Sequence, residues 1–214
     1  MECSGLRIFF RSIASVRPIS IDPLTNMLIS QKLKQENIAE YLLYMWQVED
    51  LIRANHLNID ELEANYISRF HLPTAEHAEM KEWYENLIEM MRSEGVTEKG
   101  HIQINKNILV WLTDLHLQLL KSPKYPFYSA TYYKALPLIV ELRRKAGDEQ
   151  TGELETCFNA LYGVMMLHLQ GKEISQDTAA AISQISHFIG MLAAYYKRDE
   201  EKPLFGDDLN DMDN

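Results

Sequence analysis

Several features that would point to a function are missing from this sequence. Only two cysteines occur, Cys3 and Cys157, so the chain cannot form a disulfide framework. Because Cys157 lies among Leu, Phe and Tyr residues, we expect it to be a buried free thiol in a reducing cytosol. No apolar run approaches the roughly 20 residues of a membrane-spanning helix, so we expect a soluble cytoplasmic protein. The formal net charge of −10 argues against binding to nucleic acid through a basic surface.

The motifs of catalysis and metal binding are also missing. His-Glu-x-x-His and Cys-x-x-Cys do not occur, and the one Glu-x-x-His spacing, Glu98 to His101, spans Gly100 in a predicted loop. The sequence has no glycine-rich phosphate loop and no Gly-x-Ser-x-Gly elbow. We therefore predict no catalytic residue, no metal site and no cofactor, and the sequence favours a non-enzymatic protein.

What the sequence does contain is helical periodicity, densest in the run from Ile104 to Lys121. On a helical wheel, one stripe carries Ile108, Leu112, Leu115 and Leu119, and apolar residues also occupy the flanks and the far side. A helix that is apolar on nearly all sides must be covered on nearly all sides, by its own chain or by a second subunit. We predict that this is the central helix of a bundle.

Six further helical segments are predicted by the same three- and four-residue spacing of apolar residues. They cover 29–54, 61–70, 74 to a stop at Gly95, 129–145, 154–170 and 176–198, with Asn58 and Ser175 as caps. Pro137 should kink or divide the segment 129–145, and the segment 124–128 should be an extended connector. No alternating pattern indicates a strand, and no residue pattern recurs at a fixed period. The fold class is therefore predicted to be all-α, a closed helical bundle of about six to seven helices.

The two ends of the chain differ from the middle in composition. Residues 1–26 carry three arginines and short apolar pieces, and we interpret them as a mobile N-terminal extension or upstream sequence, with a targeting peptide as the alternative. Residues 27–198 should form a single helical-bundle domain. Residues 199–214 are acidic and poor in apolar residues, which is typical of a disordered tail. Both ends should be dispensable for stability.

Two stretches carry a resemblance to a known family. MLISQKLKQENIAEYLLYMWQVEDLIRA, at 27–54, and NILVW, at 107–111, resemble the start and middle of a family of all-helical bacterial proteins defined as a domain of unknown function. The resemblance covers about 27–197 and implies an all-α fold. It implies no activity and no binding residues.

Four polar residues fall on otherwise apolar stripes: Glu49, His116, Arg143 and, at the edge of its stripe, His168. Burying an unpaired charge is costly, so such side chains pair with each other, extend to solvent or line a wet cavity. A structural network is the favoured interpretation, and a ligand pocket or an acid/base pair are the alternatives. We predict that Glu49 and Arg143 meet inside the bundle with His116 close by.

These observations favour a protein that acts through protein contacts, as a homo-oligomer. The alternative is a helical bundle that binds a small molecule in a polar pocket near Glu49 and His116, with Arg143 as a third candidate ligand-binding residue. An exposed apolar helix face would favour assembly, and a pocket lined by those residues would favour binding.

Overall fold

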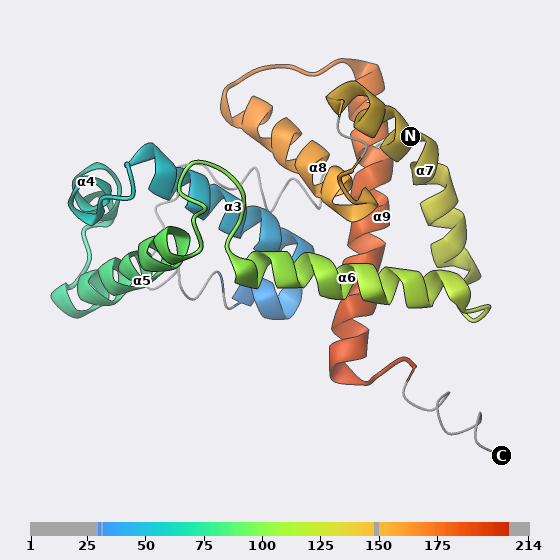
Figure 1. The fold of residues 1–214 in the computed structure, drawn as a ribbon, viewed down its shortest axis with the longest axis horizontal. Coiled ribbons are helices and arrows are strands. Elements are labelled where there is room, and N and C mark those ends of the chain that lie inside the picture. Colours follow the sequence, from blue (N-terminus) through green and yellow to red (C-terminus); the bar gives the residue numbers. More distant parts are fainter. Residues whose placement is uncertain (1–29, 31, 148–149, 206–214) are drawn as a thin grey trace. The chain divides into compact units, whose positions relative to one another are not determined.

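The computed structural model describes residues 30, 32–147 and 150–205, and these residues form an all-α protein without strands (Figure 1). The elements are α3 (Ile38–Ala54), α4 (Ile59–Asn65), the 3₁₀ helix η1 (Ile67–Phe70), α5 (Thr74–Ser93), α6 (Gln103–Lys121), α7 (Pro126–Ala146), α8 (Glu153–Leu169) and α9 (Gln176–Glu201). The predicted fold class, an all-α helical bundle, is confirmed. Among the described residues, no helix is both long enough and apolar enough to cross a membrane.

The chain divides into two compact units, each of which is described by itself. The first comprises the described residues up to Gln35 together with Glu40–Val110, and the second comprises Glu36–Ala39 and the described residues from Trp111 onward. Helix α6 therefore contributes its first part to one unit and its second part to the other.

In the first unit, α3 supplies a long buried face that includes Leu42, Met45, Trp46 and Ile52. The sequence predicted one helix over 29–54, but residue 37 is not helical. The Asn37 side chain accepts a hydrogen bond from the Ala39 amide at 3.1 Å. Asn favours this local bond over continuing a helix, so α3 starts afresh at Ile38.

Helices α4, η1 and α5 pack on one another in the same unit. Asn58 caps α4 as predicted, accepting hydrogen bonds from the amides of Asp60 and Glu61. The predicted helix 61–70 is instead two elements, because the chain leaves helical geometry at Tyr66 before η1 begins. Helix α5 matches its prediction, with a buried face of Met80, Tyr84, Leu87, Ile88 and Met91 and a left-handed Gly95 after its end.

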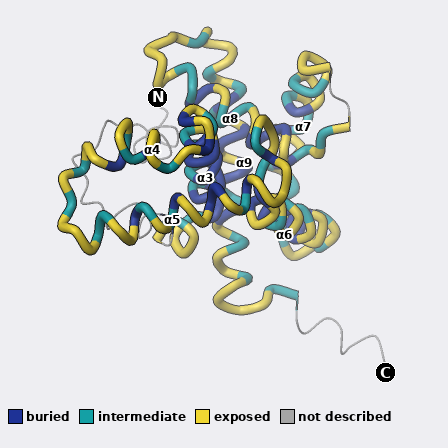
Figure 2. The backbone as a smooth tube through the Cα atoms, turned by 60° about the vertical axis from the view of Figure 1, so that its left-hand side comes forward, coloured by how far each residue is buried: buried dark blue, intermediate teal, exposed yellow. Residues whose placement is uncertain are grey.

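In the second unit, α7, α8 and α9 pack against one another. The buried faces of α8 and α9 follow the predicted spacing, and buried residues recur along α9 in Figure 2. Ser175 caps α9, and its side chain accepts a hydrogen bond from the Thr178 amide at 3.1 Å. His187 is exposed, as its place on the wheel predicts.

Helix α7 contains two prolines, and its first residue differs from the prediction. It begins at Pro126, so the last part of the predicted extended connector is already helical, as suits a proline in the first turn. Pro137 lies inside the helix, and α7 continues through it without dividing.

The expected ends of the domain are only partly described. The predicted extension 1–26 lies outside the described residues. At the other end, α9 continues through Asp199 to Glu201, and Asp199 accepts a hydrogen bond from the Leu204 amide at 2.7 Å. The ring of Phe205 then contacts Tyr125 edge to face, with centroids 5.7 Å apart.

Candidate functional site

The first candidate site is built around Glu49, a carboxylate in the middle of α3 that is only 1% exposed. Its Oε1 accepts hydrogen bonds from the Ile102 amide at 3.0 Å and from Asn105 Nδ2 at 2.8 Å. Its Oε2 lies 2.5 Å from His101 Nδ1. Three donors thus replace the water that this carboxylate lost on burial, which is why a charge can lie on the apolar stripe of α3.

His101 is held on two sides. Besides the bond to Glu49, its ring stacks on the Trp46 indole with centroids 4.1 Å apart and an interplanar angle of 10°. The side chain keeps 23% of its surface exposed, and the second ring nitrogen, Nε2, has no hydrogen bond with a described residue. The imidazole is therefore fixed in orientation, with one edge available to solvent.

The Glu49 carboxylate also serves the start of α6. The first amides of a helix lack intrahelical partners, and the residue before Gln103 is Ile102, which cannot cap. Glu49 accepts the Ile102 amide, and Glu94, at the end of α5, accepts the Gln103 amide at 2.5 Å. Two carboxylates from other segments thus cap α6, and their negative charge suits a helix N-terminus.

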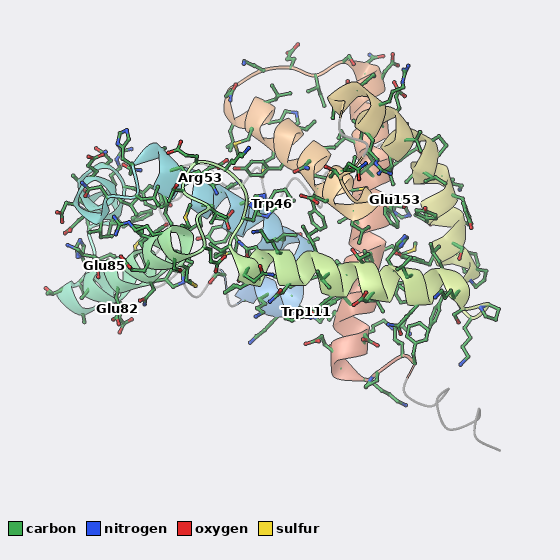
Figure 3. All side chains as sticks on the ribbon, in the orientation of Figure 1. Trp46, Arg53, Glu82, Glu85, Trp111 and Glu153 are labelled. Atoms are coloured by element: carbon green, nitrogen blue, oxygen red, sulfur yellow. The ribbon has the colours of Figure 1, made fainter. Side chains whose placement is uncertain are left out.

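Arg53, one turn after Glu49 on α3, binds the loop that precedes α6. Its Nη2 donates to the Val96 carbonyl at 3.1 Å and to the Gly100 carbonyl, while its Nη1 pairs with Asp50 at 2.9 Å. Gly100 has a φ of 85°, a conformation that suits glycine. Figure 3 labels Trp46 and Arg53 on α3, the helix from which both side chains contact this loop. The loop before α6 is thus attached to α3 at two successive turns.

The second candidate site surrounds His116, in the part of α6 that belongs to the second unit. The ring lies among Tyr128, Tyr132 and Phe188, with centroids 4.8 to 5.7 Å away. Its Nδ1 is 2.6 Å from the Tyr128 hydroxyl. Burial lowers the pKa of His116 and raises the pKa of Tyr128. The imidazole is therefore neutral near pH 7, and its Nδ1 shares a hydrogen bond with the protonated Tyr128 hydroxyl.

A second tyrosine continues this cluster toward α8. Tyr132 donates a hydrogen bond to Glu153 at 2.8 Å. Cys157, one turn after Glu153, is fully buried, and burial raises the pKa of its thiol. A protonated thiol is a weak nucleophile, which agrees with the structural role expected for Cys157.

The structure assigns hydrogen-bond partners to Glu49 and His116 within their own units. Glu49 belongs to the first unit, and His116 and Arg143 belong to the second. Arg143 is half-buried in the last turn of α7, and His168 is exposed at the end of α8. The predicted meeting of Glu49 with Arg143, with His116 close by, stays a prediction.

Sequence reasoning missed two members of the Glu49 cluster. Asn105 precedes Ile108 by three residues and Leu112 by seven, so its place on the buried stripe of α6 was visible in the sequence. His101 lies outside every helix and follows no periodicity, so no sequence signal marked it as a partner. Among the described residues, no three or more His, Cys, Asp or Glu side chains gather where they could hold a metal ion.

The second unit also exposes large apolar side chains. On α7, Phe127 is 80% exposed, Tyr133 62% and Val140 56%. On α6, Trp111 and Leu117 are about half exposed, and Figure 3 labels Trp111 on that helix. The described residues of the chain cover the face with Leu112, Leu115 and Leu119 and leave Trp111 and Leu117 half exposed, so the predicted covering of these two positions by a second subunit stays a prediction.

The fold thus defines an all-α protein with two buried polar clusters. The family model for the domain of unknown function DUF4924 matches residues 27–203, and the chain belongs to that family. This confirms the resemblance inferred from 27–54 and 107–111. Neither curated proteins nor solved structures gave a match.

Proposed function

We propose that this protein works without catalysis, through contacts with other proteins, and that it self-associates in the cytosol. The observation that carries the proposal is the exposure of Phe127, Tyr133 and Val140 on a single helix, α7. Large aromatic and branched side chains gain free energy when a partner removes them from water. Large apolar side chains exposed together on one helix favour an interaction site.

The state of the buried polar residues supports a non-catalytic role. Both oxygens of Glu49 are engaged by donors, and His116 is bonded to Tyr128 among aromatic rings. These bonds account for the burial of both side chains without any substrate. A satisfied structural network is what the sequence favoured for these positions.

Sedimentation velocity of the full chain tests the proposal. If the protein self-associates, its mass rises from one chain toward two as the concentration increases from about 1 to 100 µM, the range expected for a modest interface. A mass of one chain throughout that range contradicts self-association. The same runs at high salt separate apolar from ionic contributions, because salt screens only the latter.

Small-molecule binding is the second candidate, and one observation favours it. His101 is fixed by Glu49 and Trp46, yet it keeps Nε2 without a described partner. A hydrogen-bonding ligand could use that nitrogen. A native mass spectrum of the purified protein tests this directly: an added mass that disappears in His101→Ala supports binding there, and an unmodified chain mass in both proteins contradicts it.

A further inference from the structure

The exposed face of α7 has a regular composition. All of the following residues on it are exposed: Phe127, Ala130, Tyr133, Lys134, Pro137, Val140 and Glu141. The opposite face carries the buried residues Tyr128, Tyr132, Ala135 and Ile139. With about 100° between successive residues, the exposed set forms one continuous stripe along the helix.

This stripe has a small centre and two different edges. Ala130 and Pro137 lie along its middle, seven residues apart, and the exposed Arg144 continues this line in the last turn of the helix. Tyr133 and Val140 form one edge with the same spacing. A repeat of seven residues keeps a stripe facing a partner helix, and small central residues allow two helices to approach closely.

The other edge carries opposite charges seven residues apart, Lys134 and Glu141. Lys134 has no ion pair with a described residue, and Glu141 uses Oε1 to pair with Lys145 at 2.7 Å. Two copies of α7 that run antiparallel, with a twofold axis between Pro137 and Leu138, place each Lys134 opposite the other Glu141. A parallel pair would instead place this charged edge opposite the edge that carries Tyr133 and Val140, so neither charge would meet an opposite charge.

We propose that α7 pairs antiparallel with α7 of a second copy of the chain around this axis, with Lys134 and Glu141 exchanging partners across it. The inference rests on the proposed self-association and names its surface. The second copy is favoured over an unrelated protein because the stripe is complementary to itself in charge. One helix face from each copy is a small interface, so we expect dissociation constants in the micromolar range.

Charge reversal tests the pairing. Lys134→Glu and Glu141→Lys each replace two attractive contacts by two repulsive ones, so each variant alone should dimerise about tenfold more weakly. A mixture of the two variants restores both attractions, because one chain then carries two acidic residues and the other two basic ones. Native mass spectrometry of the mixture, with one variant mass-tagged, should show the mixed dimer in excess over either homodimer.

The matched control reverses a charge elsewhere in the same unit. Glu155 is exposed on α8, so Glu155→Lys should leave the dimer unchanged. Circular dichroism melts of all variants establish that each one folds. If neither charge reversal changes the dissociation constant of the dimer, the proposed α7 pairing is wrong, although the protein still self-associates. A chain that is monomeric at every concentration overturns both, and mixing without preference for the mixed dimer overturns the antiparallel arrangement.

A cysteine near the axis gives an independent readout. In a Cys3→Ser background, Pro137→Cys should form a disulfide between copies under mild oxidation, since residues at such an axis approach within disulfide reach, about 7 Å between Cα atoms. Gln184→Cys, exposed on α9, is the control and should stay reduced. Equal crosslinking of the two variants contradicts the proposed axis.

Discussion

Replacing Glu49 with alanine should destabilise the protein more than any other single change to a polar side chain. The carboxylate accepts hydrogen bonds from His101, the Ile102 amide and Asn105, and it is almost completely buried. Removing one partner of a buried ionic network costs about 3 to 5 kcal/mol, because the remaining donors stay buried without an acceptor. We expect the free energy of unfolding to fall by that amount.

Glu49→Gln removes the negative charge of the side chain and keeps its shape, so it measures the contribution of the charge. The amide oxygen can still accept from Ile102 and Asn105, and the new amide group can donate to Nδ1 of the His101 ring. We therefore expect a smaller loss of about 1 to 2 kcal/mol. Urea unfolding followed by circular dichroism measures both variants, and Glu85→Ala, exposed on α5 and labelled in Figure 3, is the control, with a change within about 0.5 kcal/mol.

A double-mutant cycle identifies the partner. Glu49→Ala and His101→Ala should be non-additive by at least about 1 kcal/mol, because they remove the same contact. The cycle of Glu49→Gln with Arg143→Met tests the pairing predicted from the sequence in the same way. If Glu49→Ala costs less than about 1 kcal/mol, or if its effect simply adds to that of His101→Ala, the buried network does not stabilise the fold as reasoned.

Three further changes test other parts of the structure. Burial lowers the pKa of His116, so the folded protein binds fewer protons than the unfolded chain, and its stability should fall as the pH drops below about 6.5. Between pH 7 and pH 5, the melting temperature should therefore fall less in His116→Gln than in the parent protein. His187→Gln, which changes an exposed histidine, is the control and should behave like the parent. Asn58→Ala removes the cap of α4 and should cost about 1 kcal/mol in urea unfolding, whereas Asn86→Ala, exposed within α5, should cost nothing. In a Cys3→Ser background, a thiol reagent should modify Cys157 only after denaturant is added, and fast modification of the folded variant would contradict the burial of Cys157.

The helices were predictable wherever apolar periodicity and caps agreed. Asn58 and Ser175 cap α4 and α9, as their sequence positions indicate, because a side chain three residues or fewer from the amides it satisfies is a local signal. The boundaries that differed have local causes as well. Asn37 interrupts a periodic segment by capping, and Pro126 begins α7 where an aromatic connector was predicted.

The candidate site was predictable only in part. Because Glu49 and His116 are polar residues on apolar stripes, the sequence predicted that they are buried and hydrogen-bonded. The stripe does not show which residue each of them bonds to. Tyr128 lies in the segment 124–128, which was predicted to be an extended connector, and His101 lies in a loop. The exposure of Trp111 could not be foreseen either, because a wheel shows that a face is apolar without showing what covers it.

The position of His101 next to Glu49 follows from how α6 begins. Its first turn contains no Ser, Thr or Asp cap before Gln103, so its free amides need acceptors from elsewhere in the chain. Glu49 and Glu94 supply them: Glu49 comes from α3, which is distant in sequence, and Glu94 comes from the end of the preceding helix α5. A carboxylate drawn to the start of α6 for this reason is within reach of His101, which precedes Ile102. The Glu49–His101 pair is therefore explained by capping alone, and any ligand at His101 Nε2 would use a group that the fold had already fixed in place.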